Sequence, residues 1–327
     1  MAKYESKSIR NLAVTGHGGT GKTSLCESFL YVTGKTDRPG RVDEGTSSMD
    51  YEPEEQKRRI SISAATNHIE WDKHRINIID TPGDSNFAYD TKSCLRVVDS
   101  ALVLVDAVGG VEFQTEKVWE FAEEYKLPRM IVVSRMDRER ADFFQALESI
   151  RSRFGGKKVT VFCLPIGKES GFKGVVDLVS MKAVLFDADK RQVKTAEIPA
   201  DMAADVKKYR DILTEDIAET DDELMNKYLE AGELSPEDFR TGLRRAVVAG
   251  SIIPVSCGSA INHLGITPLL DLITQFFPSP VDAGAATGTN PGTQNAETRQ
   301  PEESAPFSAF VFKTIADPYA GRLTLFR

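Results

Sequence analysis

The chain has 327 residues, of which 41% are hydrophobic, and its formal net charge at pH 7 is −8. This length can bury a sizeable core and allows two domains, while the acidic balance disfavours unspecific binding to nucleic acid, which needs clustered Lys and Arg. The sequence has no run of about eighteen apolar residues and no apolar stretch of a signal peptide at its start, so we expect a cytoplasmic protein without membrane contact.

The first predicted element is a short strand, Leu12–Val14, followed directly by GHGGTGKT at residues 16–23. This matches the phosphate-binding pattern G-x-x-x-x-G-K-[ST], in which glycines let backbone N–H groups close around the α- and β-phosphates. Lys22, expected to be an exposed loop residue, would reach the β- and γ-phosphates, and the Thr23 hydroxyl would bind Mg²⁺ at the start of a helix. The nucleotide-binding residues predicted in this loop are Gly16, His17, Gly18, Gly19, Thr20, Gly21, Lys22 and Thr23.

Two further strands are predicted at Ile60–Ala64 and Ile76–Ile79, and the second leads into Asp80-Thr81-Pro82-Gly83. We expect Asp80 to hold Mg²⁺ through water, because a carboxylate oxygen suits this cation. Gly83 would bring its backbone N–H against the γ-phosphate, a close approach that favours glycine. The sequence therefore predicts a magnesium site beside the phosphate loop.

Strands predicted at Ala101–Val105 and Met130–Val133 come next, and the second ends in Ser134-Arg135-Met136-Asp137. This motif resembles the guanine box [NT]-K-x-D. The Asp137 carboxylate can accept two hydrogen bonds, from guanine N1–H and N2–H₂, and adenine offers no such pair. The residues predicted to bind the base here are Ser134, Arg135 and Asp137.

From about Gly155 to Gly250 the spacing of the strands breaks, which indicates an insertion with its own strands and a long polar helical region. The strand-like pieces in it are Val159–Leu164, Gly174–Leu178 and Ala183–Phe186. A strand at Ile252–Val255 then leads to Cys257-Gly258-Ser259-Ala260. There, a backbone N–H of Ser259 or Ala260 would meet guanine O6.

After Pro278-Ser279-Pro280 the composition shifts to Ala, Gly, Thr, Asn, Glu and Pro, which predicts a flexible linker. Residues 306–312 alternate like a β-strand, residues 317–321 are typical of a turn, and 323–326 would form a second strand. About twenty residues cannot close a β-domain of their own, so the sequence is expected to be the front part of a longer protein.

The alternation of strands and helices predicts an α/β fold with a doubly wound, mostly parallel sheet. The resemblance of the motifs above to those of translational GTPases implies that this sheet is a P-loop GTPase core, which would carry an inserted α+β subdomain and the truncated start of a β-barrel domain. The expected boundaries are 1–155 for the P-loop GTPase core, 156–250 for the insert, 251–280 for the last strand and helix of the core, 281–305 for the linker and 306–327 for the barrel strands.

The four cysteines lie far apart and form no C-x-x-C pair, and the four histidines show no ligand spacing. This pattern disfavours a zinc ribbon or a disulfide framework and favours buried thiols. The cysteines are Cys26, Cys94, Cys163 and Cys257.

Together these motifs resemble translational GTPases, most closely the bacterial elongation factor G family. The segments FKGVVDLVSMKA (172–183) and ETDDELMNKYLE (219–230) look like the subdomain inserted in the GTPase domain of that family. The resemblance implies GTP or GDP and Mg²⁺ as cofactors, a ribosome as the partner of the full-length parent, and a monomer. It is also carried by residues 15–23, 49–51, 60–66, 78–84, 136–138, 141–143, 254–260 and 317–327.

Several positions depart from the family pattern. Ser61 replaces the threonine whose hydroxyl binds Mg²⁺ and keeps the oxygen, so we expect it to join the metal site with Thr23 and Asp80. Arg135 replaces a lysine and keeps a flat cation over the base, whereas Ser134 is too short for both of asparagine's hydrogen bonds. The phosphate loop also has a glycine in place of an aspartate, and it should still wrap phosphate.

The most serious departure is Asp84, which stands where the family has the histidine of D-T-P-G-H, thought to position the attacking water. The catalytic positions that the resemblance implies are Lys22, Gly83 and Asp84. A carboxylate only accepts hydrogen bonds and repels a triphosphate, so we expect slower hydrolysis. Alternatively, Asp84 turns away and pairs with Arg58 or Arg59.

The favoured hypothesis is a GTP-binding and GTP-hydrolysing translation factor of the elongation factor G type that acts on the ribosome. A second hypothesis is a GTP-sensing regulatory paralogue with weak or no hydrolysis, which the changes at Asp84 and Ser134 favour. A third, an ATP-dependent kinase, is disfavoured by Asp137 and by the pair Ser259 and Ala260.

Overall fold

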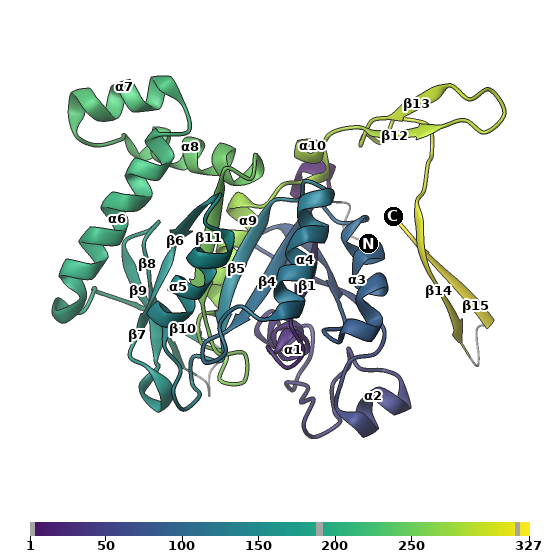
Figure 1. The fold of residues 1–327 in the computed structure, drawn as a ribbon, viewed down its shortest axis with the longest axis horizontal. Helices are drawn as coiled ribbons and strands as arrows, with labels where there is room; N and C mark the ends of the chain where they lie inside the picture. Colours follow the sequence, from purple (N-terminus) through teal and green to yellow (C-terminus); the bar gives the residue numbers. More distant parts are fainter. Residues whose placement is uncertain (1–3, 188–191, 318–320) are drawn as a thin grey trace.

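The computed structural model describes residues 4–187, 192–317 and 321–327. Seven strands form the central sheet: β1 (Ile9–Gly16), β2 (Ala65–Trp71), β3 (His74–Asp80), β4 (Ser100–Asp106), β5 (Arg129–Ser134), β6 (Lys158–Val161) and β11 (Ile252–Cys257). Their order is β2-β3-β1-β4-β5-β11-β6, and neighbours are parallel except β2 and β3 (Figure 1). The predicted mostly parallel sheet is confirmed.

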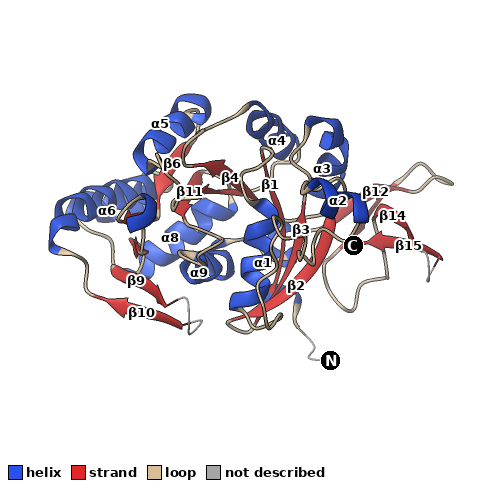
Figure 2. Cartoon of the chain, turned by 90° about the horizontal axis from the view of Figure 1, so that it is seen from below, coloured by secondary structure: helices blue, strands red, loops and turns tan. Residues whose placement is uncertain are grey.

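Helices cover both faces of this sheet, as its apolar strands require. Every residue of β4 and β5 is buried, the pattern of a parallel sheet with no face open to water. Helices α3, α4 and α5 lie over one face, and α1, α8 and α9 over the other (Figure 2). The bounds are α1 (Lys22–Val32), α2 (Pro53–Arg58), α3 (Ala88–Leu95), α4 (Phe113–Glu124), α5 (Phe143–Phe154), α8 (Pro236–Val248) and α9 (Ile266–Phe276).

The strand predicted at Ile60–Ala64 is wrong, because β2 begins only at Ala65 and the residues before it are irregular. The backbone N–H groups of Ile62 and Ser63 donate to the Glu55 carboxylate over 2.8 and 2.9 Å. Donors that are occupied by a side chain cannot join a sheet ladder. The alternating I-S-I-S pattern therefore does not become a strand.

A second sheet follows the central one. It is antiparallel, in the order β10-β9-β8-β7, and it is the inserted part of the fold. The predicted strand Val159–Leu164 is two strands, since β6 pairs with β11 in the central sheet and β7 belongs to the second sheet. Phe162 lies between them, fully buried. Its N–H donates to Val255 O over 2.8 Å and its carbonyl accepts from Leu178 N over 2.9 Å. The strands are β7 (Cys163–Ile166), β8 (Gly174–Asp177), β9 (Lys182–Asp187) and β10 (Gln192–Ala196).

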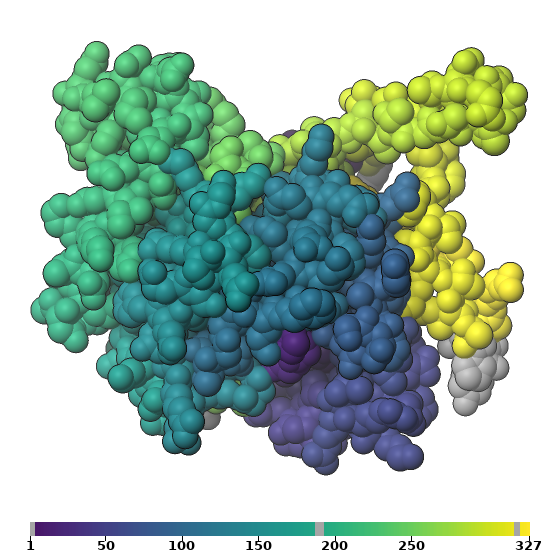
Figure 3. Space-filling model, in the orientation of Figure 1, coloured from purple at the N-terminus to yellow at the C-terminus, as the bar shows by residue number. Residues whose placement is uncertain are grey.

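The polar helical region predicted after these strands folds as α6 (Ala203–Ala218), α7 (Asp222–Ala231) and α8. Side chains define where the helices begin. Asp221 accepts the N–H groups of Glu223 and Leu224, and Ser235 accepts that of Asp238 with a proline at the first helical position. In Figure 3 the α7 region projects from the body at one end.

The chain after α10 (Pro280–Ala283) forms two hairpins. The first, β12 (Ala286–Thr289) with β13 (Ala296–Arg299), lies within the predicted linker and projects from the other end of the molecule (Figure 3). The second, β14 (Val311–Asp317) with β15 (Gly321–Phe326), starts later than the alternation at 306–312 predicts. The centre of the predicted turn, residues 318–320, lies outside the described residues.

All four cysteines are buried, as expected, and free of disulfide bonds. None of the helices in the described part of the chain combines the length and apolar character needed to span a bilayer.

Candidate nucleotide-binding site

A pocket of about 590 Å³ opens at the carboxyl edge of the central sheet. Strands β1, β3, β4, β5 and β11 all end there, which is where open α/β sheets bind ligands. In Figure 3 the N-terminal segment, purple, lies at the bottom of a hollow near the middle of the face. The predicted site residues that line the pocket are His17, Gly18, Gly19, Thr20, Gly21, Lys22, Thr23, Ser61, Gly83, Asp84, Ser134, Arg135, Asp137 and Ala260. The other predicted site residues, Gly16, Asp80 and Ser259, are not among the residues that line the pocket.

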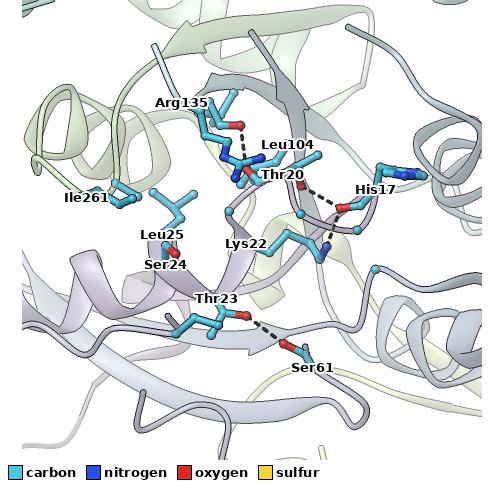
Figure 4. A pocket seen from close by; sticks show the side chains of 18 of the residues that line it. His17, Thr20, Lys22, Thr23, Ser24, Leu25, Ser61, Leu104, Arg135 and Ile261 are labelled. Atoms are coloured by element: carbon cyan, nitrogen blue, oxygen red, sulfur yellow. Dashed lines mark hydrogen bonds between the residues drawn. The ribbon is translucent and has the colours of Figure 1, made fainter. Parts of the chain in front are cut away.

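The phosphate loop connects β1 to α1 through left-handed backbone. Gly19 and Gly21 have φ of 78° and 88°, a region that favours glycine. The Thr20 hydroxyl donates to His17 O over 2.9 Å and closes the loop on itself (Figure 4). The residues of the loop itself thus determine its conformation.

Lys22 is buried, although the sequence predicts an exposed loop lysine. It is the first residue of α1, and its ammonium donates to His17 O over 2.8 Å (Figure 4). Burial lowers the pKa of Lys22, while the negative charge of Asp80 opposes this shift. The ammonium is therefore held inside the loop, where a phosphate would compensate its desolvation.

The predicted metal ligands lie together. Thr23 Oγ1 and Ser61 Oγ are 2.9 Å apart, and Ser61 donates to Asp50 Oδ1 over 2.8 Å (Figure 4). Asp80 is 3% exposed, and within the described part of the chain its Oδ1 has no hydrogen-bond partner. Burial raises the pKa of Asp80, and its neighbour Lys22 opposes the shift.

These hydroxyl and carboxylate oxygens fit Mg²⁺, a hard cation that binds oxygen ligands. An orphaned buried carboxylate oxygen is costly unless a cation or water satisfies it. Asp50, which is buried and contacts Ser61, was not predicted as part of this group. No spacing pattern in the sequence marks it.

Gly83 packs directly on the phosphate loop. A Cβ atom at this position would lie 2.8 Å from the nitrogen and the Cα of Gly18, closer than atoms approach without a shift. Any other residue would therefore push the segment away from the loop. The predicted approach of the Gly83 N–H to a γ-phosphate stays a prediction.

Asp84 caps its own loop. Its Oδ1 accepts the backbone N–H of Asn86 over 2.8 Å at the start of the short helix Ser85–Phe87. The alternative, an ion pair of Asp84 with an arginine, is not seen among the described residues: Arg58 pairs with Glu54, and Arg59 lies at the pocket wall with φ of 58°. The carboxylate is satisfied locally because an aspartate readily caps a following turn.

Ser134 joins the guanine motif to the phosphate loop. Its hydroxyl donates to Thr20 O over 2.7 Å and lies 3.2 Å from Val105 O. One hydroxyl therefore reaches two carbonyl oxygens, although a serine has a single proton to share between them.

Arg135 lies over the phosphate loop, with φ of 62° and Nη1 3.2 Å from Asp106 Oδ2. A Cβ atom on Gly19 would be 4.0 Å from Nη1, so a longer side chain at that position would meet the guanidinium. Burial lowers the pKa of Arg135, and Asp106 opposes the shift. Asp106 in turn accepts the N–H groups of Val108 and Gly109.

The two remaining predicted contacts to the base are a carboxylate and a backbone N–H, and they differ in whether they are already hydrogen-bonded. Asp137 is half-buried, and its carboxylate accepts none of the hydrogen bonds in the described part of the chain. The N–H of Ser259 is committed to Leu264 O over 3.0 Å. Of the predicted pair, Ala260 lines the pocket and Ser259 does not.

Gln114 also lines the pocket and was missed in the sequence. It lies in the first turn of α4, is 2% exposed, and within the described residues neither its amide oxygen nor its amide nitrogen has a hydrogen-bond partner. Apolar residues that line the pocket were missed as well, since single Leu and Ile residues carry no motif. They include Leu25, Ile261 and Leu269.

The chain is similar to known proteins in two comparisons. The family described as Elongation factor Tu GTP binding domain matches residues 7–279. The chain is also similar to the crystal structure of ttk003000868 from Thermus thermophilus, with a TM-score of 0.86 and 33% sequence identity over 98% of this chain. The match covers 45% of that protein, so the chain spans less than half of its length.

Proposed function

The chain belongs to the elongation factor Tu GTP-binding domain family, and from this premise we propose that it is a guanine-nucleotide switch of the elongation factor G type. In this proposal it binds GTP or GDP with Mg²⁺ and hydrolyses GTP to GDP and phosphate. As part of a longer parent it would act on the ribosome in the cytoplasm. The chain itself would be a monomer.

One observation carries the proposal. A single pocket is lined by Asp137 and Ala260 and also by Lys22 of the phosphate loop. The first pair matches the edge of guanine, which offers two donors and one acceptor. The lysine and the loop amides match a polyphosphate.

The chain's own residues would perform phosphoryl transfer mostly by positioning. Lys22 holds a positive charge where phosphate oxygens would lie, and the packing of Gly83 on Gly18 fixes the loop that faces the γ-phosphate. Thr23, Ser61 and Asp80 would hold Mg²⁺, which supplies further positive charge beside those oxygens.

A second function is favoured by Asp84. Its carboxylate is bound to the amide of Asn86, and neither this group nor its charge suits the positioning of an attacking water. The alternative is a GTP-sensing regulatory protein with weak or no hydrolysis. Such a sensor would have the same nucleotide site as the translation factor and would differ from it in the rate of GTP hydrolysis.

Two measurements test these functions. Displacement of fluorescent GDP from the chain by GTP, but not by ATP, is expected, and equal displacement by both would contradict the guanine site. GTP turnover by the full-length parent, with and without ribosomes, then separates the two candidates. Ribosome-stimulated turnover supports the translation factor, and tight binding without turnover supports the sensor.

A further inference from the structure

Lys313 lies on β14, outside the family match at 7–279, and its ammonium points into the GTPase core. Nζ donates to Ser63 Oγ over 2.6 Å and to the Ala64 carbonyl over 2.7 Å. It is also 3.4 Å from Asp90 Oδ2, and Asp90 accepts the backbone N–H of Ala64 over 2.7 Å. The lysine side chain is only 10% exposed. In Figure 1 this hairpin lies beside α3, the helix that carries Asp90.

This contact fixes the segment that carries a predicted magnesium ligand. Ser61 stands two residues before Ser63, and the backbone N–H groups of Ile62 and Ser63 are held by Glu55 from the other side. The segment is thus clamped between Glu55 on one side and the pair of Asp90 and Lys313 on the other. The Ser61 hydroxyl can face Thr23 only while this short stretch keeps its path.

The Lys313 ammonium stabilises this conformation of Ser63 and Ala64. A buried Lys is costly unless its three donors are satisfied, and here three oxygens lie around it. Hydrogen bonds from a charged donor are also stronger than neutral ones. If the segment moved, Lys313 would lose two of its acceptors at once.

We propose that Lys313 is a positioning residue that keeps Ser61 in the magnesium site, so that the β14–β15 hairpin takes part in the nucleotide switch. The inference rests on the proposed function, because it assumes a Mg²⁺-bound triphosphate in the pocket. Coupling of this kind is reciprocal. Occupation of the site by GTP and Mg²⁺ therefore favours the contact of Lys313 with Ser63 and Ala64, and this contact favours occupation.

Arg327 offers a matched control, because it anchors the same hairpin elsewhere. Its Nη2 contacts both oxygens of Asp99 over 2.7 and 2.9 Å, and its Nη1 donates to Val97 O over 3.1 Å. Neither contact involves the segment around Ser61. Loss of the Arg327 side chain removes one anchor of the hairpin and leaves every Lys313 contact to that segment in place.

The test compares the 327-residue chain with Lys313→Met, Lys313→Arg and Arg327→Met. Each protein binds a fluorescent, non-hydrolysable GTP analogue while Mg²⁺ is titrated, and GDP affinity is measured in parallel. Amide hydrogen exchange over residues 60–66 provides a readout independent of turnover.

We expect Lys313→Met to raise the half-saturating Mg²⁺ concentration for the GTP analogue at least about fivefold, and to leave GDP affinity within about twofold. Exchange over residues 60–66 should become faster in the analogue-bound protein. Lys313→Arg should recover part of both effects, since it restores a charged donor. Arg327→Met should match the wild type.

An unchanged Mg²⁺ dependence in Lys313→Met would overturn the inference, as would an equal shift in Arg327→Met, which would mean that hairpin docking alone matters. Both outcomes leave the proposed function standing if the wild type binds GTP and GDP. A wild-type chain that binds neither nucleotide would instead overturn the proposed function, and the inference with it.

Discussion

The Ser134 hydroxyl donates a hydrogen bond to the backbone carbonyl of Thr20 over 2.7 Å. These residues belong to the guanine motif and the phosphate loop, which lie 114 positions apart in the chain. The two halves of the nucleotide site are therefore one connected unit rather than two neighbouring loops.

Replacement Ser134→Ala should weaken this unit. The Thr20 carbonyl would lose its side-chain donor, at a cost of about 1–3 kcal/mol, and the phosphate loop would become more mobile. We expect a lower melting temperature and faster dissociation of both GDP and GTP, measured with a fluorescent nucleotide. Ser152→Ala is the matched control, because that exposed serine only bonds a carbonyl of its own helix. Equal dissociation rates in the two variants would contradict the prediction.

Guanine selectivity should depend on Asp137. Replacement Asp137→Asn removes the acceptor pair for guanine N1–H and N2–H₂, and we expect GDP affinity to fall by about 3 kcal/mol, or roughly a hundredfold. The new amide can donate to the C2 carbonyl of xanthine. Competition binding should therefore show tighter binding of xanthosine diphosphate than of GDP, and preserved GDP affinity would exclude Asp137 as the base contact.

Lys22 should contribute more to phosphate binding than to the stability of the fold. Replacement Lys22→Met keeps the buried stem and removes a desolvated charge, which offsets the loss of the hydrogen bond to His17 O, so the melting temperature of the nucleotide-free protein should change little. GTP affinity should fall at least about tenfold, because each charge-assisted bond contributes about 1.5–3 kcal/mol. Calorimetric titration measures this, and Lys117→Met on the exposed face of α4 should behave as wild type.

Hydrolysis should respond to Asp84. In the full-length parent, Asp84→His would supply a group that titrates near neutral pH and can orient water. We expect ribosome-stimulated GTP hydrolysis to rise at least about tenfold with nucleotide affinity nearly unchanged, measured in single-turnover assays. Asp84→Asn controls for the loss of charge alone. A wild-type rate that already equals that of a histidine-bearing factor, or a slower rate in Asp84→His, would contradict the prediction.

The sequence predicted the parts of the site that depend on local spacing. The glycine-rich loop, Gly83 and Asp137 each follow a predicted strand. The carboxyl ends of parallel strands meet at one edge, so their meeting in one pocket could be inferred. The cap formed by Asp84 is also local, since it reaches only two residues ahead.

The parts that were missed depend on contacts that no motif or spacing pattern encodes. The N–H of Ser259 is used by Leu264, which no motif indicates, and the burial of Lys22 depends on the segments packed around the loop. The strand expected at Ile60–Ala64 failed because Glu55 occupies its backbone donors. Periodicity describes which side chains are apolar and says nothing about which carboxylate reaches the backbone.

The break between β6 and β7 connects the central sheet to the second sheet through a single residue. Phe162 is hydrogen-bonded to Val255 of the central sheet and to Leu178 of the inserted part, so neither sheet can tilt without pulling on the other. A load applied to the second sheet would reach β11, which ends at Cys257, just before Ala260. Movement of the second sheet relative to the central sheet would therefore be transmitted through Phe162 to β11 and to the part of the pocket that Ala260 lines.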